Sequence, residues 1–241
     1  TLLAARPSIG TTTLAMNIAF HAAAVEERRV LFFSLDSRGD IDQRFVSYVA
    51  RVDASKMRRP SRLLGDEWAR LALAAEALRE VPLHIGCYSC HTVSILEDLC
   101  QEARCENPFE LVVVDSLELV REGGEPRRET RVRRDERIEK MGRRLKALAK
   151  KLCVSMLVLA GVDRAIEVRA DHRPTLADLP LGGRVADLAE TVMFIYRDEV
   201  YVEDTPDPGI AEIIVAKEPR DQAGTVRLRF DGPRLRFGDD R

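Results

Sequence analysis

The chain has 241 residues, 32% of them charged, and a formal net charge of −2 at pH 7. This length suits one α/β domain with a buried core, and the near-zero net charge excludes an overall basic field, so any contact with DNA would have to come from a local patch. No apolar run could span a bilayer and no signal peptide opens the sequence, so we expect a cytoplasmic protein without a membrane partner, whose five cysteines stay thiols.

A turn near the start separates a short apolar strand from an apolar helix. The turn and the hydroxyl residues after it are Arg6, Pro7, Ser8, Ile9, Gly10, Thr11, Thr12 and Thr13. In phosphate-binding loops of this form, backbone amides bind a β-phosphate, a lysine neutralises phosphate oxygens and the next hydroxyl holds Mg²⁺. Here Thr11 stands at the lysine position. The loop alone therefore fits either a phosphate site or an ordinary capped strand-to-helix turn.

The rest of the chain alternates apolar strands with amphipathic helices. Helices are predicted at 13–27, 41–52, 66–79, 93–105 and 129–152, and strands at 30–35, 82–85, 111–115, 154–159, 192–195, 210–215 and 225–230. Continuous apolar strands are typical of parallel sheets buried on both faces. We predict an α/β fold, with a mainly parallel central sheet flanked by helices and antiparallel strands near the C-terminus. Trp68 is expected to anchor the helix at 66–79.

Two carboxylates directly follow or end predicted strands. Asp36 comes after the strand at 30–35, and Asp115 is the last residue of the strand at 111–115. Ligands of parallel sheets bind at the carboxyl ends of the strands. We therefore expect both carboxylates to lie on the same edge of the sheet as the loop at Thr11.

Several ordered blocks of sequence resemble the RecA-like motor domain of the DnaB-type replicative helicases, nearly end to end. They are Ala-Arg-Pro-Ser-x-Gly-x-Thr-Thr in the loop and the stretches 143–150, 169–174, 193–201, 209–214 and 224–228. The resemblance implies a RecA-like P-loop fold over 1–241, cut from a longer protein. It also implies ATP or ADP with Mg²⁺, a ring of usually six copies, and single-stranded DNA drawn through the centre.

The resemblance assigns roles to particular residues. Thr12 and Asp115 would bind the metal ion, and Asp36 would replace the catalytic glutamate of the family. Lys217 would act on the phosphate of the neighbouring subunit, with Arg220 one place beyond the family's arginine finger. The DNA-facing loop of the family corresponds to Gly182, Gly183 and Arg184, preceded by Pro180 and Leu181 instead of arginine and glutamate.

Three charge-bearing or sensing groups of the family are changed in this chain. The loop lysine is Thr11, the γ-phosphate-sensing glutamine is Gly161, and the arginine finger is displaced. One missing charge-stabilising donor lowers a rate about 10²–10³-fold and a missing arginine finger about 10³–10⁵-fold. We therefore expect a helicase-like module with weakened or lost hydrolysis, which assembles with itself or with an intact helicase. The alternative is an active motor in which Arg6, Lys217 or Arg220 supplies the missing charge.

Two other motifs fit weaker hypotheses. Cys87-Tyr88-Ser89-Cys90-His91 matches a haem attachment motif and, with Cys100 and Cys105, could suggest zinc, although buried or capping thiols are favoured. A basic run of arginines between 127 and 137 could contact DNA phosphates. Its interleaved acids and its lack of aromatic residues favour a solvated helix start.

Overall fold

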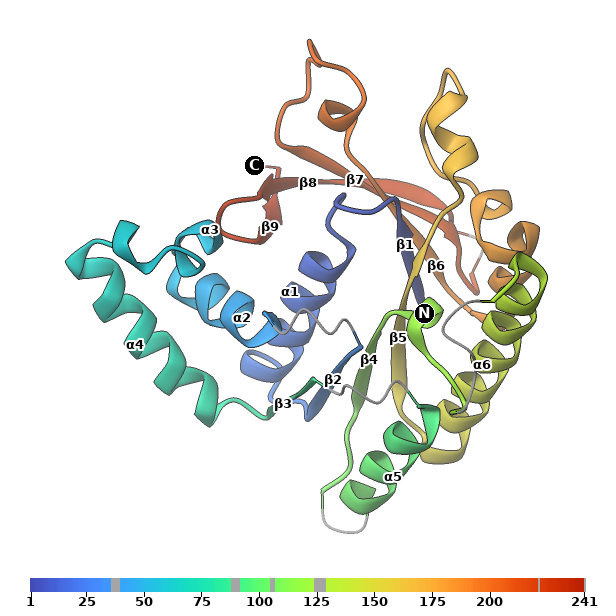
Figure 1. The fold of residues 1–241 in the computed structure, drawn as a ribbon, viewed down its shortest axis with the longest axis horizontal. Coiled ribbons are helices and arrows are strands. Elements are labelled where there is room, and N and C mark those ends of the chain that lie inside the picture. Colours follow the sequence, from blue (N-terminus) through green and yellow to red (C-terminus); the bar gives the residue numbers. More distant parts are fainter. Residues whose placement is uncertain (36–39, 88–91, 105–106, 124–128, 221, 241) are drawn as a thin grey trace.

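The centre of the molecule is one sheet of nine strands, in the order β3-β2-β4-β5-β1-β6-β7-β8-β9 (Figure 1). The computed structural model describes residues 1–35, 40–87, 92–104, 107–123, 129–220 and 222–240. The strands are β1 Leu2–Ala5, β2 Val30–Ser34, β3 Leu83–Cys87, β4 Leu111–Asp115, β5 Ser155–Gly161, β6 Val192–Tyr196, β7 Ile210–Lys217, β8 Gly224–Asp231 and β9 Arg236–Asp239. Strands β1 to β6 pair in parallel and β7 to β9 pair antiparallel, which confirms the predicted fold class.

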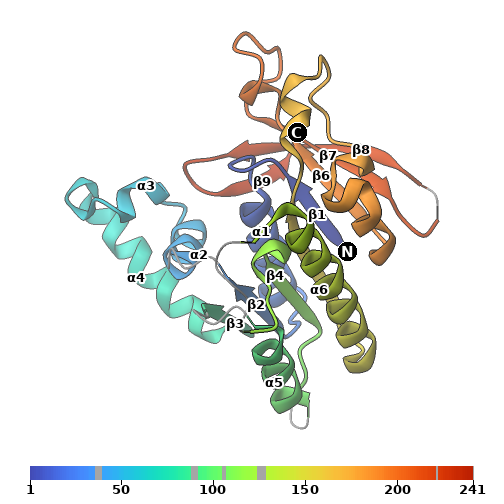
Figure 2. The same ribbon diagram turned by 45° about the vertical axis from the view of Figure 1, so that its right-hand side comes forward.

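Helices cover the parallel part of the sheet on both faces (Figure 2). The helices are α1 Thr11–Ala24, α2 Ile41–Ala50, α3 Ala54–Met57, α4 Gly65–Glu80, α5 Val93–Arg104 and α6 Arg131–Leu152. Apolar residues of α5 and α6 form a core with one face of the sheet, and those of α1 and α2 form a core with the other. This explains why Phe32 and Phe33, consecutive residues that point to opposite faces, are both fully buried.

Short 3₁₀ helices fill several connections. They are η1 Pro60–Arg62, η2 Leu117–Leu119, η3 Arg164–Val168, η4 Leu176–Asp178, η5 Pro180–Leu188 and η6 Asp198–Val200. None of the described helices is long and apolar enough to cross a membrane.

The structure corrects two expectations about single elements. Trp68 does not anchor α4, because its side chain is 52% exposed, and the helix is held to its neighbours through Leu71 and Ala74 instead. The prediction also missed β9, which pairs with β8 and packs against α1. Its sequence, Arg236-Phe237-Gly238-Asp239, contains one large apolar residue, so alternation alone could not identify it.

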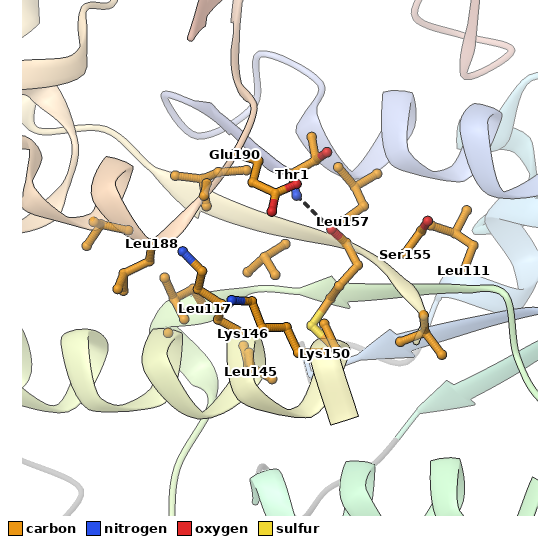
Figure 3. A pocket seen from close by; sticks show the side chains of 18 of the residues that line it. Thr1, Leu111, Leu117, Leu145, Lys146, Lys150, Ser155, Leu157, Leu188 and Glu190 are labelled. Atoms are coloured by element: carbon orange, nitrogen blue, oxygen red, sulfur yellow. Dashed lines mark hydrogen bonds between the residues drawn. The ribbon is translucent and has the colours of Figure 1, made fainter. Parts of the chain in front are cut away.

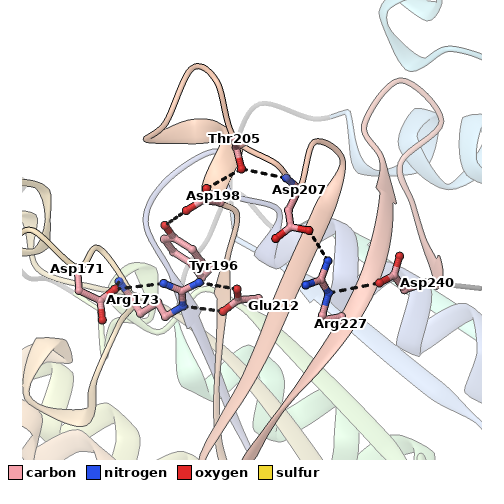
Figure 4. Close-up of polar contacts among 9 residues, drawn as sticks. All are labelled: Asp171, Arg173, Tyr196, Asp198, Thr205, Asp207, Glu212, Arg227 and Asp240. Carbon is pink, nitrogen blue, oxygen red and sulfur yellow. Dashed lines mark hydrogen bonds and ion pairs between the residues drawn. The ribbon is translucent and has the colours of Figure 1, made fainter.

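A polar network connects the segment after β5 to the last residue of β6 and to the part of β7 that pairs with it (Figure 4). The guanidinium of Arg173 lies over the ring of Tyr196, 4.6 Å from its centroid, and pairs with the carboxylate of Glu212 at 2.6 Å. Asp198 accepts hydrogen bonds from the hydroxyls of Tyr196 and Thr205, both at 2.6 Å. The network therefore joins three separate segments at the edge where the parallel strands end.

Candidate nucleotide-binding site

The loop between β1 and α1 has a backbone that only certain residues can adopt. Ser8 and Gly10 have φ values of 68° and 126°. A Cβ at Gly10 would lie 3.1 Å from the ring of Phe237, so glycine suits this position both conformationally and sterically. Among the described residues, no side chain caps the first turn of α1. The amides at this helix N-terminus are therefore available to an anion.

The two predicted metal-binding residues lie next to each other. The hydroxyl of Thr12, in the first turn of α1, donates a 2.8 Å hydrogen bond to the Oδ2 atom of Asp115 at the end of β4. Because β4 pairs in register with β2, Asp115 lies beside Ser34. Asp36 itself lies outside the described residues.

A cavity of about 240 Å³ opens beside Thr12, directly after the loop. Residues of the loop helix, of α2 and of the ends of β2 and β4 line it: Thr12, Ser34, Asp40, Ile41, Arg44, Asp115, Ser116, Glu118 and Leu119. Six of these nine residues carry a hydroxyl or a carboxylate, which is the donor chemistry that Mg²⁺ prefers. Thr12 and Asp115 thus fit the binding of a magnesium ion.

Thr11 adds no charge to the loop, and the guanidinium of Arg6 contacts residues that follow β5 instead of lying over the loop. Thr11 is the first residue of α1 and is partly exposed. The guanidinium of Arg6 pairs with the carboxylate of Glu167 at 2.7 Å and donates to the carbonyl of Val162 at 3.1 Å. Both partners follow β5, so Arg6 is held at the neighbouring strand end rather than over the loop.

Two arginines that the sequence analysis did not consider lie against the loop or its helix. Arg44 of α2 lines the cavity and donates a 3.0 Å hydrogen bond to the hydroxyl of Thr13. Arg197, after β6, donates to the carbonyl of Ile9 at 3.2 Å and stacks on Phe230, 4.1 Å from the ring centroid. One feature of the sequence could have identified Arg44: it is a basic residue on the mostly apolar face of α2 that packs against the core.

Lys217 and Arg220 lie far from the loop within one chain. Lys217 pairs with Val192 at the start of β6, which is level with Leu2 at the start of β1. The loop follows the other end of β1. The ammonium of Lys217 donates to the carbonyls of Ala186 and Ala189 at 2.9 and 2.8 Å, and Arg220 is exposed beyond β7. Neither residue reaches the Thr12 cavity of its own chain.

The predicted DNA-facing residues lie in η5. Leu181, Gly182 and Gly183 all have positive φ, and a Cβ at Gly183 would lie 2.7 Å from the carbonyl oxygen of Leu176. Arg184 is exposed, with its guanidinium 3.9 Å from the carboxylate of Glu139 on α6. The segment is thus a tight turn packed on α6, distant in sequence from the loop.

A second cavity, of about 480 Å³, lies where the parallel strands begin (Figure 3). Leucines of α6, of η5 and of the strand starts line it, together with Lys146, Lys150 and Glu190. This cavity is at the edge of the sheet opposite the loop, and it contains none of the predicted nucleotide-binding residues.

The weaker motifs are only partly described by the structure. Residues 88–91 and Cys105 lie outside the described residues, and Cys100 is buried, which raises the pKa of its thiol to about 11. The part of the chain that is described holds no cluster of three or more histidine, cysteine or acidic residues suited to a metal. In the basic run, Arg137 is buried and ion-paired with Glu129, whereas Arg133 and Arg134 are exposed at the start of α6.

Comparison with known proteins supports one family. The family model described as "DnaB-like helicase C terminal domain" matches residues 1–239. The chain is 38% identical over 239 residues to the replicative DNA helicase DnaB of Pasteurella multocida, covering 98% of this chain and 50% of the relative. The corresponding helicase of Geobacillus stearothermophilus is 31% identical over 230 residues, covering 95% and 50%. The chain thus spans about half the length of these curated relatives.

Solved structures agree with this match. One that is described as an ATPase domain superposes with a TM-score of 0.89 at 26% identity, covering all of this chain and 84% of that one. A DnaB-like replicative helicase, described with its interactions with primase, also gives 0.89 at 26% identity, covering 100% and 57%. The RadB recombinase, at 15% identity and a TM-score of 0.54, shares the fold and is covered over 90% of its chain.

Proposed function

Because this chain belongs to the family of DnaB-like helicase C-terminal domains, we propose that it is a nucleotide-binding helicase module whose ATP hydrolysis is weakened or lost. Residues 1–241 act as one RecA-like ATPase domain. The module serves DNA replication by assembling with copies of itself or with an intact replicative helicase, in the cytoplasm.

The contact that carries this proposal is the hydrogen bond between Thr12 and Asp115 beside a loop that has no lysine. The 2.8 Å contact preserves the pair that would hold Mg²⁺ on ATP or ADP. Magnesium, when bound, would neutralise phosphate charge and orient the phosphate chain. Backbone amides at the start of α1 bind the phosphates, but Thr11 adds no charge to stabilise the transition state. Binding is therefore retained better than turnover.

The position of Lys217 and Arg220 supports an assembled state. Since both residues lie at the opposite edge of the sheet from Thr12, they meet a phosphate only if a second copy presents its loop to them. A closed ring, of six copies by resemblance to the family, provides this arrangement. Single-stranded DNA would pass Gly182, Gly183 and Arg184, and Arg184 is the exposed arginine of this segment.

The alternative function is an active ATP-dependent DNA helicase motor with an unusual phosphate site. One observation favours it: Arg44 lines the cavity that Thr12 and Asp115 share. Arg6 does not supply this charge in the structure, because it pairs with Glu167. Loss of turnover on replacing Arg44 with methionine, with nucleotide binding retained, would support this alternative.

The test is to measure binding of labelled ATP and ADP together with phosphate release, with and without single-stranded DNA. We expect measurable binding with turnover far below the usual enzyme range of about 1–10³ s⁻¹. Restoring the cation with Thr11→Lys should raise phosphate release by roughly 10²-fold, as expected for one charge-stabilising donor. Thr11→Ala is the matched control and should change little. Fast, DNA-stimulated hydrolysis by the unmodified protein would contradict the proposal.

A further inference from the structure

Glu118 is a carboxylate of the candidate site to which neither the sequence analysis nor the comparisons assign a role. Its Oε1 atom accepts a 2.7 Å hydrogen bond from the backbone amide of Gly161, the last residue of β5. The side chain therefore connects the segment after β4 to the end of β5. Gly161, its partner, corresponds by resemblance to the γ-phosphate-sensing glutamine of the family. It also lines the 240 Å³ cavity with Thr12 and Asp115.

The backbone beneath Glu118 is rigidly supported. The buried guanidinium of Arg137 donates to the carbonyl of Glu118 at 3.0 Å and to that of Val120 at 2.8 Å. Arg137 is in turn paired with Glu129. With its backbone and one carboxylate oxygen both held, the carboxylate of Glu118 is fixed at a defined place in the cavity.

If the loop binds a nucleotide as proposed, a third phosphate would extend from the loop toward this cavity. Loop amides bind the β-phosphate at the start of α1, and the cavity opens directly after them at Thr12. Its described lining carries three carboxylates, from Asp40, Asp115 and Glu118, and one cation, Arg44. Asp40 pairs with Arg58 at 2.7 Å, and Thr12 donates to Asp115. Within the described residues, the remaining carboxylate, that of Glu118, accepts from a neutral amide and forms no ion pair.

We propose that Glu118 makes this site selective for nucleoside diphosphates over triphosphates. The inference rests on the proposed function, since it concerns the same nucleotide site. A fixed carboxylate repels the γ-phosphate of a triphosphate, whereas a diphosphate ends at the loop and does not meet it. In a loop that has lost its lysine, no ammonium of the loop offsets this repulsion.

The experiment compares Glu118→Gln with the unmodified protein. Glutamine keeps an oxygen acceptor for the amide of Gly161 and removes only the charge, so melting temperatures should agree. The probes are fluorescent ADP and a fluorescent non-hydrolysable ATP analogue, each titrated with Mg²⁺ and with a chelator. We expect the unmodified protein to prefer ADP by roughly ten-fold, the size expected of one like charge in a hydrated cavity, and Glu118→Gln to bring the ratio near one.

Glu122→Gln is the control, since Glu122 carries the same charge four residues away, pairs with Lys140 and does not line the cavity. An unchanged ratio in Glu118→Gln, with both nucleotides still bound, would overturn the selectivity and leave nucleotide binding intact. Weaker binding of the triphosphate analogue in Glu118→Gln would overturn it too, by making Glu118 a metal-side ligand. If neither protein binds either nucleotide, nucleotide binding itself is wrong and the selectivity with it.

Discussion

At the scale of single residues, the segment that carries Glu118 is supported by a buried ion pair between Arg137 and Glu129. Arg137 is 7% exposed and its partner Glu129 is 12% exposed, and Arg137 also satisfies the carbonyls of Glu118 and Val120. Its hydrogen bonds hold the pKa of Glu129 below the ordinary range. A buried charge so completely paired leaves several groups unsatisfied when its partner is removed.

We therefore expect Arg137→Met to lower the free energy of unfolding by about 3–5 kcal/mol, the usual cost of breaking a buried ion pair. Arg143 lies on the same helix in an exposed pair with Glu139, so Arg143→Met should cost less than about 0.5 kcal/mol. Urea unfolding followed by circular dichroism measures both. Equal effects would show that the Arg137 pair does not support the segment of Glu118.

At the scale of elements, Asp198 connects the end of β6 to the turn after it, and its pKa is lowered by these contacts. Hydrogen bonds from Thr205 and Tyr196 hold the pKa of Asp198 below its ordinary value. Burial, together with the same contact, raises the pKa of Tyr196. The ionised form of Asp198 is thus the form that the folded network prefers.

The pH dependence of stability follows from this preference. Because the pKa of Asp198 is lower in the folded chain than in the unfolded chain, its contribution is complete above about pH 4 and is lost as the pH falls further. In Asp198→Asn, the free energy of unfolding should be lower at pH 7 and should fall less steeply below pH 4. Asp204→Asn, an exposed acid of the same turn, is the control for a general change in charge. Identical pH profiles for Asp198→Asn and the unmodified protein would contradict the role of the network.

At the scale of the whole molecule, the two halves of the proposed catalytic machinery occupy opposite edges of one sheet. Thr12 and Asp115 lie where the parallel strands end, and Lys217 lies level with the point where they begin. One chain therefore presents the proposed phosphate site on one side and the cations on the other. Such a surface suits head-to-tail association, which closes into a ring when the rotation between copies allows it.

We expect the purified chain to sediment at a mass several times its 27.1 kDa, more strongly with Mg²⁺ and ADP. Arg220→Glu should weaken this association, because it would place a carboxylate against the acidic cavity of the next copy. Arg62→Glu reverses an exposed charge on η1 and should leave the mass unchanged. A mass of 27.1 kDa at every concentration would exclude self-assembly.

Much of this arrangement could be predicted from local patterns. Apolar runs such as 111–115 are buried on both faces wherever helices cover a parallel sheet, so strand positions and fold class followed from local sequence alone. The turn through Gly10 and the hydroxyls after it were recognisable for the same reason, since a loop backbone and a helix start need particular residues. β9 was missed because it contains one large apolar residue, so its alternation is too weak to indicate a strand. The exposure of Trp68 was missed because it depends on how α4 packs against the rest of the fold.

The sequence by itself determined the positions of most strands, the loop and the absence of lysine at Thr11, because these depend on residues close together in the chain. Only the tertiary structure decided which charges meet at the cavity. Arg6 turns to Glu167, Arg44 reaches Thr13, and Glu118 binds the amide of Gly161. These contacts join segments that are 31 to 161 positions apart. Their partners are selected by strand order, which no local pattern encodes.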